Sequence, residues 1–309
     1  MRSCHSRFSI FEFRFSNFGF YEFRVSIFEF RVFGVSADAM TDRYAIIAGN
    51  GHFPFLVLEA AREQGIDPLV VGIKEEAASE LAKVASAIHW LSLGEVSKLL
   101  DLLVAEKVNK VVLAGQVKHA QLFSSIKPDG LVSRLLKSLP RKNTDALIGI
   151  FVRMLESRGV QVVDSTLFLK PLLTEAGPLT HRAPDAEEQS DIGYGREIAK
   201  KLAGLDIGQT IVVSGRACIA VEAMEGTDAT IERAAGLSNG RALAVVKVSK
   251  PRQDMRFDVP VVGLKTIQVM RRSNARVLAV DAGKTLLFER PAVIKEADEA
   301  GIAIVGMEE

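Results

Sequence analysis

The sequence predicts an α/β protein with a parallel-sheet N-terminal domain followed by a smaller α+β C-terminal domain. Between residues 44 and 164, short apolar runs rich in β-branched residues alternate with stretches of helical composition, a pattern typical of a parallel sheet covered by helices. A stretch containing three prolines and one glycine follows at residues 171–184. Beyond it the pattern changes to a β-hairpin with mixed strands and helices, so we place a domain connection there.

Composition excludes several classes of protein. The chain has 309 residues, of which 48% are hydrophobic and 25% charged, and its formal net charge is +1. This balance argues against a nucleic-acid-binding protein, and no apolar run approaches the roughly 20 residues that cross a bilayer. Cys4 and Cys218 are the only cysteines, so neither a disulfide framework nor a cysteine metal site is encoded. We expect a cytoplasmic protein.

Residues 1–39 differ from the rest of the chain. A phrase of aromatic, Glu, Phe and Arg recurs at 11–14, 21–24 and 28–31, and ten of the seventeen phenylalanines precede Met40. A secretory signal needs a continuous apolar centre, which is missing here, whereas alternating phenylalanine and charge is typical of an aggregation-prone β segment. We therefore expect a start at Met40, with residues 1–39 a non-native or disordered extension translated from upstream sequence.

The expected N-terminal domain, residues 40–170, opens with a glycine turn. A strand at 44–48 is followed by Gly49, Asn50 and Gly51 and then by a helix at 55–64. In such a Rossmann-like arrangement, backbone N–H groups at a helix N-terminus face a phosphate. Only two of the three fingerprint glycines are present, and a tight βα turn is the plain alternative.

The next strands suggest where a ligand binds. After the strand at 68–73 comes Lys74 rather than an acidic ribose ligand, so we expect no NAD. Ligands of parallel sheets lie at the carboxyl ends of strands, which makes Gly115 and Gln116, directly after a strand at 110–114, a second candidate. The remaining expected elements are a short strand at 89–90, helices at 95–106 and 146–158, and a strand at 160–164.

The expected C-terminal domain, residues 185–309, is organised around a hairpin that leads into a helix. Strands at 210–214 and 218–221 flank a turn at Gly215, and a helix follows at 229–235. The other expected elements are a helix at 185–202, strands at 242–248 and 259–263, a helix at 266–273, a hairpin across 281–284, a helix at 291–300 and a strand at 302–305.

Three carboxylates, Glu222, Glu225 and Asp228, lie within seven residues at this junction. Such crowding costs free energy unless a cation, a helix dipole or hydrogen bonds compensate it. Thr227 or Asp228 could cap the helix, but a cap leaves the two glutamates unexplained. We expect these three carboxylates to be metal ligands. Oxygen ligands without a His or Cys cluster indicate Mg²⁺, with Mn²⁺ as a substitute.

A basic segment follows the strand at 242–248. Lys247, Lys250 and Arg252 lie close together in the sequence, and cationic groups near an acidic site could clamp a diphosphate. A solvated loop is the alternative interpretation. The expected substrate-binding set comprises Gly49, Asn50, Gly51, Gly115, Gln116, Lys247, Lys250, Gln253, Asp254 and Thr266.

From Met40 to Glu309 the sequence resembles the LpxI family, the UDP-2,3-diacylglucosamine pyrophosphatases of lipid A biosynthesis. The order of several phrases along the chain makes the resemblance specific. These phrases are IAGNGHFP at 47–54, AGQV at 114–117, TDAL at 144–147, DIGQ at 206–209, AVEAMEGTD at 220–228 and KPRQDMR at 250–256. One departure is Lys118, where relatives often have an arginine.

The resemblance implies a Rossmann-like N-terminal domain and a C-terminal domain of its own type, with substrate held between them. It also implies Mg²⁺-dependent hydrolysis of the substrate to UMP and 2,3-diacylglucosamine 1-phosphate, with Asp228 as the essential aspartate. We further expect a homo-oligomer that contacts the inner membrane peripherally through its lipid substrate. The alternatives are a nucleotide-sugar-binding or regulatory protein without turnover, and, less favoured, an NAD-dependent oxidoreductase.

Overall fold

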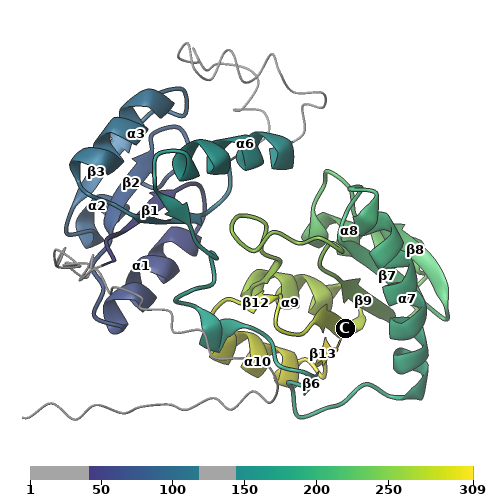
Figure 1. The fold of residues 1–309 in the computed structure, drawn as a ribbon. Coiled ribbons are helices and arrows are strands. Elements are labelled where there is room, and N and C mark those ends of the chain that lie inside the picture. Colours follow the sequence, from purple (N-terminus) through teal and green to yellow (C-terminus); the bar gives the residue numbers. More distant parts are fainter. Residues whose placement is uncertain (1–41, 118–143, 309) are drawn as a thin grey trace, which may run out of the picture. The chain divides into compact units, whose positions relative to one another are not determined.

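The computed structural model describes residues 42–117 and 144–308 and contains two main β-sheets (Figure 1). The expectations about residues 1–39, the start at Met40 and Lys118 lie outside the described residues. The boundaries expected for the two domains stay a prediction.

The first sheet is entirely parallel and has the strand order β3-β2-β1-β4-β5. Its strands are β1 (Tyr44–Ala48), β2 (Leu69–Ile73), β3 (Ile88–Leu91), β4 (Lys110–Ala114) and β5 (Gln161–Val162). The chain winds from β1 through β2 to β3 on one side and then places β4 and β5 on the other. The strand order therefore reverses between β1 and β4, and ligands of such sheets bind outside the carboxyl ends at this point.

Continuous apolar runs form these strands because both faces of the sheet are buried. Ala45 and Ile47 belong to a core with α3 (Val96–Ala105) and α6 (Thr144–Glu156). Ile46 and Ala48 belong to a core with α1 (Phe53–Glu63) and α2 (Leu81–Val84) on the opposite face. The result is a helix–sheet–helix sandwich.

The second sheet is mixed and has the strand order β6-β13-β11-β9-β7-β8. Its three central strands β9, β11 and β13 are parallel, whereas β7, β8 and β6 pair antiparallel at the two sides. The strands are β6 (Gly177–Pro178), β7 (Thr210–Ser214), β8 (Ala217–Val221), β9 (Leu243–Lys247), β11 (Ala275–Asp281) and β13 (Ala303–Met307). The predicted hairpin of β7 and β8 is confirmed.

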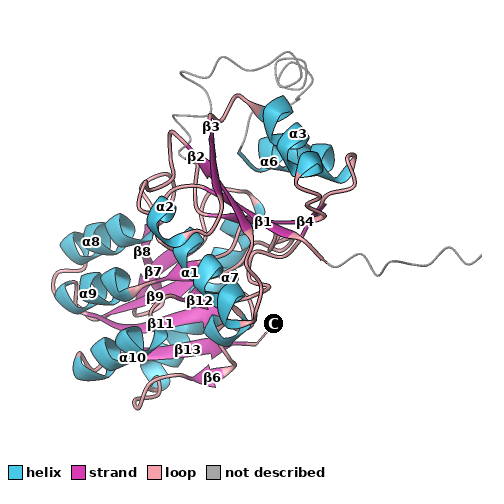
Figure 2. Cartoon of the chain, turned by 90° about the vertical axis from the view of Figure 1, so that its left-hand side faces the viewer, coloured by secondary structure: helices cyan, strands magenta, loops and turns pink. Residues whose placement is uncertain are grey.

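Helices cover both faces of this sheet as well. One face packs against α7 (Ala186–Gly204), and the other packs against α8 (Thr227–Leu237), α9 (Leu264–Arg272) and α10 (Arg290–Glu299). Figure 2 shows α8, α9 and α10 one above another beside the strands. The predicted fold class, a parallel-sheet domain followed by a second domain of mixed helices and strands, is confirmed.

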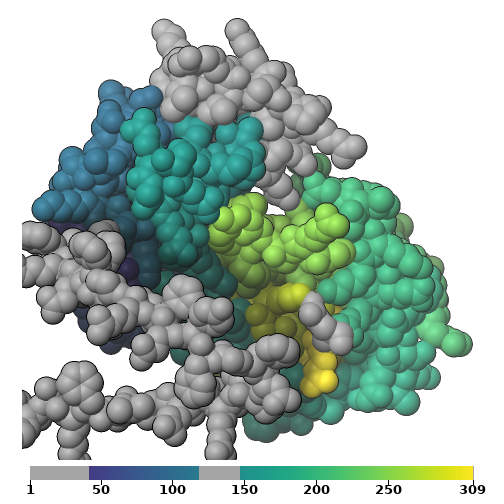
Figure 3. All heavy atoms as spheres, in the orientation of Figure 1, coloured from purple at the N-terminus to yellow at the C-terminus, as the bar shows by residue number. Residues whose placement is uncertain are grey.

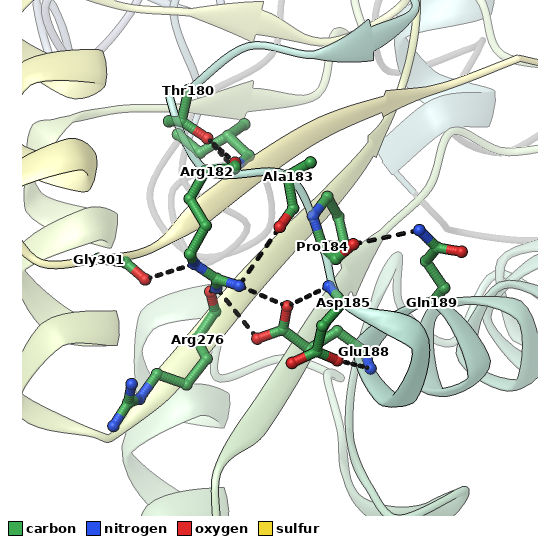
Figure 4. Close-up of polar contacts among 10 residues, drawn as sticks. Thr180, Arg182, Ala183, Pro184, Asp185, Glu188, Gln189, Arg276 and Gly301 are labelled. Atoms are coloured by element: carbon green, nitrogen blue, oxygen red, sulfur yellow. Dashed lines mark hydrogen bonds and ion pairs between the residues drawn. The ribbon is translucent and has the colours of Figure 1, made fainter.

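The start of α7 is fixed by a capping box and an arginine network (Figure 4). The Asp185 side chain accepts a hydrogen bond from the Glu188 backbone, and the Glu188 side chain accepts one from Asp185 N. Arg182 donates to both Glu188 oxygens at 2.7 and 3.0 Å, to the Gly301 carbonyl at 2.9 Å and to the Arg276 carbonyl. These bonds tie the start of α7 to β11 and to the segment that enters β13.

The hairpin expected across residues 281–284 is wrong. β12 (Leu286–Leu287) pairs in parallel with β10 (Val261–Val262), not with β11. Gly283 N instead donates to the Thr174 carbonyl, which turns the chain away. Leu286 and Leu287 are both fully buried, each in a different apolar core, so burial rather than local turn chemistry decides the pairing.

Across residues 42–117 and 144–308, no helix combines the length and the apolar character that crossing a bilayer requires. A 3₁₀ turn, η1 (Lys170–Leu172), and the short strand β6 occupy the stretch expected to connect the domains.

Candidate functional site

Two glycines bring the ends of β1 and β4 into direct backbone contact. Asn50 N donates to the Gln116 carbonyl at 2.7 Å, and Gln116 N donates to the Asn50 carbonyl at 3.0 Å. A Cβ on Gly49 would lie 2.6 Å from the Gln116 carbonyl oxygen. A Cβ on Gly115, whose φ is +94°, would lie 2.6 Å from the Asn50 carbonyl oxygen. We call Gly49 and Gly115 the glycine pair, because neither position has room for a side chain.

The glycine pair lies at the carboxyl ends of adjacent parallel strands, where the strand order reverses. Gly51 has a φ of +94°, and a Cβ at this position would meet no heavy atom within 4 Å, so its backbone faces open space before α1. The structure thus brings together all five candidates of the N-terminal domain, which are Gly49, Asn50, Gly51, Gly115 and Gln116.

Sequence reasoning missed Glu76 beside this turn. Its carboxylate is nearly buried and its Oε2 accepts a hydrogen bond of 3.3 Å from Asn50 Nδ2. Glu76 follows β2 by three residues, which is close to where a dinucleotide-binding fold has its acidic ribose ligand. An acidic residue shortly after the second strand is visible in the sequence, but the expectation rested on Lys74, which directly follows β2.

Asp228 lies in the first turn of α8, as predicted. Its Oδ1 accepts a 2.8 Å hydrogen bond from Thr266 Oγ1 and its Oδ2 lies 3.3 Å from Lys265 Nζ. Both partners belong to the first turn of α9, so the N-termini of two helices meet at this carboxylate. The position before the helix is Gly226, with a φ of +84°, and no side chain caps it. The capping alternative for Thr227 or Asp228 is therefore wrong.

Thr227 joins neighbouring side chains through its hydroxyl. The hydroxyl donates to Glu222 Oε1 at 2.8 Å and accepts from Lys247 Nζ at 2.8 Å, and Thr210 Oγ1 lies 3.2 Å away. We call Glu222, Thr227, Thr210 and Lys247 the Thr227 cluster. It connects the end of β8 and the end of β9 with the residue directly before Asp228.

Lys247 supplies the positive charge of the Thr227 cluster. It is only 9% exposed, and its ammonium group forms no ion pair with any described residue. Its hydrogen-bond partner Thr227 is neutral, and the Glu222 carboxylate is linked to it only through the Thr227 hydroxyl, so the ammonium retains attraction for an anion. Among the three basic residues expected to clamp a diphosphate, Lys247 is thus the one whose surroundings fit that role.

The hydrogen bonds of the Glu225 side chain with Arg233 and Ala223 involve neither the Thr227 cluster nor Asp228. Its carboxylate pairs with Arg233 Nη2 at 2.6 Å and accepts from Ala223 N at 3.1 Å. A hydrogen bond from its own backbone N–H, followed by the Arg233 pair, lowers the pKa of Glu225 to about 2. The carboxylate is therefore ionised but already neutralised by its arginine.

The structure does not assemble the three carboxylates as one ligand group. Glu222 is held by Thr227, Glu225 by Arg233 and Asp228 by Thr266. Within residues 42–117 and 144–308, no group of three or more His, Cys, Asp or Glu is placed to bind one metal ion. The donor chemistry still fits Mg²⁺, which usually takes one or two protein carboxylates and completes its shell with water and phosphate oxygens. Asp228, partly exposed, is the carboxylate that fits best.

Side chains of the segment after β9 already have hydrogen-bond and ion-pair partners within the protein. Lys250 Nζ pairs with Asp206 at 2.8 Å and with Asp258 at 3.2 Å. Gln253 Oε1 accepts from Lys250 N at 2.6 Å. Asp254 accepts three hydrogen bonds from Arg256, whose guanidinium holds the pKa of that carboxyl below its usual range.

These bonds shape a loop rather than leave its side chains free for a ligand. The part of the chain around residue 250 forms part of the surface, in yellow-green, on the face shown in Figure 3. Ser165 anchors the loop from the other side, since its hydroxyl contacts both the Leu113 and the Arg256 carbonyls at 2.6 Å. The structure thus gives Lys250, Gln253 and Asp254 structural partners, and their role in binding substrate stays a prediction.

Two family models match the chain over most of its length. Residues 43–172 match the LpxI N-terminal domain, and residues 175–305 match the LpxI C-terminal domain. A relative from Caulobacter vibrioides, named UDP-2,3-diacylglucosamine pyrophosphatase LpxI, is 32% identical over 276 residues. The matched region is 86% of this chain and 98% of that relative.

Solved structures resemble the chain only weakly. A biotin carboxylase domain of the Hydrogenobacter thermophilus 2-oxoglutarate carboxylase has 12% identity and a TM-score of 0.25, with 57% of this chain and 35% of that chain covered. The biotin carboxylase of Campylobacter jejuni has 13% identity and a TM-score of 0.26, with 65% and 43% covered. Similarity at this level supports no conclusion about fold or function.

Proposed function

Because the chain belongs to the LpxI family, we propose that it hydrolyses the diphosphate of UDP-2,3-diacylglucosamine to UMP and 2,3-diacylglucosamine 1-phosphate. Both family domains match in order, and a relative with this named activity is covered over almost its whole length. The observation that supports the proposal most strongly in the structure is the buried ammonium of Lys247, without an ion-pair partner among the described residues, beside the first turn of α8.

A diphosphate needs concentrated positive potential. Lys247 offers a cation whose burial strengthens its attraction for phosphate oxygens. The N-termini of α8 and α9 add unsatisfied N–H groups and the positive ends of two helix dipoles. We propose that these three elements bind the diphosphate and stabilise the negative charge that develops when water attacks phosphorus.

Asp228 supplies the acidic group that hydrolysis requires. Thr266 and Lys265 each contact one of its oxygens, so the carboxylate is oriented while lone pairs on both oxygens stay available. We propose that Asp228 positions the attacking water and accepts its proton, or holds Mg²⁺ at the phosphates. Mg²⁺ bound there would neutralise phosphate charge and lower the pKa of a bound water.

The glycine pair suits the uridine diphosphate end of the substrate. Its position at the carboxyl ends of β1 and β4 is where α/β sheets bind nucleotides. Gly51, with open space beside it, allows a ligand to approach the backbone closely. We propose that Asn50 and Gln116, fixed by their mutual hydrogen bonds, bind polar groups of this end.

The proposal is tested by incubating the purified chain with UDP-2,3-diacylglucosamine and Mg²⁺ and measuring UMP. We expect UMP release that stops with excess EDTA and returns with Mg²⁺ or Mn²⁺. Full activity in excess EDTA would contradict the metal requirement. Tight binding of the substrate without any UMP would instead favour a nucleotide-sugar-binding or regulatory protein.

A further inference from the structure

Three of the large apolar side chains that are exposed in the structure belong to two loops next to the candidate site. Leu205, Ile207 and Met224 are 70%, 46% and 84% exposed. Leu205 and Ile207 belong to the loop between α7 and β7, and Met224 belongs to the loop between β8 and α8. Single exposed apolar residues are ordinary, whereas a cluster of them marks an interaction surface.

The two loops touch each other. A Cβ on Gly208 would lie only 1.9 Å from the Glu222 carbonyl oxygen, so the first loop crosses the end of β8 without a side chain between them. Gln209 N also donates to Glu222 Oε2 at 3.3 Å. Ile207 directly precedes Gly208 and Met224 follows Glu222 by two residues, so both belong to the adjoining segments. We call Leu205, Ile207 and Met224 the apolar patch.

Charged side chains border the apolar patch, and one of them is an exposed cation. Asp206, which lies between Leu205 and Ile207 in the chain, is paired with Lys250 at 2.8 Å. Pro251 would lie 3.7 Å from a Cβ on Gly204, which brings the next residue, Arg252, to the border of the patch. Arg252 is exposed and forms no ion pair with any described residue. An apolar tip bordered by an exposed positive charge complements an anionic lipid surface.

We propose that the apolar patch docks the enzyme on the surface of an anionic lipid bilayer. The inference rests on the proposed function, because a diacylated substrate has its acyl chains in a membrane. Glu222 belongs to the Thr227 cluster and directly neighbours both loops, so docking here presents the reaction site to a headgroup. The three side chains are exposed and belong to loops, and exposed apolar side chains can enter the lipid interface individually.

Vesicle flotation with the full chain tests the proposal. The patch variant replaces Leu205, Ile207 and Met224 with serine. The matched control variant replaces Val84, Val104 and Leu237, which are 45%, 54% and 56% exposed elsewhere on the chain, with serine. Both variants retain residues 1–39, so that phenylalanine-rich segment cannot cause a difference between them.

We expect the full chain to bind vesicles that contain phosphatidylglycerol more tightly than pure phosphatidylcholine vesicles. The patch variant should bind at least about tenfold more weakly, because it loses three insertable side chains, while the control variant stays within about twofold. Arg252→Gln should weaken binding to the anionic vesicles alone. Equal losses in the two serine variants, or no vesicle binding by the unchanged chain, would overturn the proposal.

Activity assays distinguish membrane docking from two other roles of the apolar patch, namely binding acyl chains directly and binding a second protein. With a short-chain, water-soluble substrate analogue the patch variant should turn over within about threefold of the unchanged chain, and with vesicle-embedded substrate it should fall by about tenfold. Equal losses on both substrates would show that the patch binds acyl chains directly, and a dimer that the patch variant abolishes in sedimentation velocity would show a protein interface. Either result overturns membrane docking. If the unchanged chain releases no UMP in either assay, the proposed function fails, whereas flotation still decides the docking.

Discussion

The glycine pair and the Thr227 cluster both lie at strand ends, but they are built differently. At the glycine pair, the backbones of two turns hydrogen-bond directly and no side chain fits between them. At the Thr227 cluster, a buried lysine, a glutamate and two threonines meet through one hydroxyl. The difference teaches that the first region depends on shape and the second on charge, so substitutions should affect binding and turnover differently.

The largest effect is expected at Asp228. Asp228→Ala should lower kcat by about 10²-fold or more, because the group that acts on water or metal is lost. The melting temperature should fall only slightly, since the substitution removes one hydrogen bond from Thr266 and an exposed pair with Lys265 but no cap of α8. Steady-state UMP release and thermal unfolding monitored by circular dichroism measure both. Activity within a few-fold of the unchanged chain would refute the catalytic role.

The two lysines of the basic segment provide a matched comparison within the charged region. Lys247→Met should lower kcat/KM by about 10²-fold, because it removes the buried cation expected to contact phosphate. Lys250→Met removes the pairs with Asp206 and Asp258 and should keep kcat/KM within about threefold while destabilising the chain by about 1 kcal/mol. A larger loss of kcat/KM in Lys250→Met than in Lys247→Met would instead indicate that the loop after β9 contacts the phosphates.

Alanine at two glycines separates packing from ligand approach in the shape-dependent region. Gly49→Ala brings a Cβ to 2.6 Å from the Gln116 carbonyl oxygen and should destabilise the chain by about 2 kcal/mol. At Gly51 a Cβ meets no protein atom, so Gly51→Ala should cost about 1 kcal/mol for its positive φ and raise KM through contact with substrate. Urea unfolding and KM measurements distinguish them. An unchanged KM for Gly51→Ala would indicate that this turn only connects β1 with α1 and does not contact substrate.

The smallest effect concerns Glu225. Because its pKa is lowered from 4.5 to about 2, the ionised group stabilises the fold above the unfolded-state pKa, and this stabilisation is lost as pH falls from about 4.5 to 2. Glu225→Gln should therefore flatten the decline of the melting temperature across that pH window. Its side chain is partly exposed, so added salt should reduce the difference between the two proteins. Identical pH profiles would contradict the Arg233 pair.

The sequence was sufficient for the features that depend on local pattern. Apolar runs on both faces predicted β1 and β4 with their observed ends, and the hairpin before α8 placed Asp228 in a first helical turn. Because carboxyl ends of parallel strands share one sheet edge, the meeting of Gly49 with Gly115 also followed.

The features that the sequence could not provide depend on partners distant in the chain. Lys250 and Lys247 look alike as sequence, but only folding shows that Lys250 pairs with Asp206 and Asp258. The parallel pairing of β12 with β10 likewise arises from the burial of two leucines in two different cores. Periodicity reports the local face of an element and says nothing about which distant element covers it.

The most direct test of the contrast between the glycine turn and the charged region measures substrate binding and the chemical step separately. Substrate affinity by calorimetry and the single-turnover rate at saturating substrate should be measured for Asp228→Asn and Gly51→Val. We expect Asp228→Asn to lose about 10²-fold in rate with its Kd within about threefold, and Gly51→Val to weaken Kd by about tenfold with its rate within about threefold. Loss of the same quantity in both variants would contradict the assignment of substrate binding to the turn at Gly51 and of chemistry to Asp228.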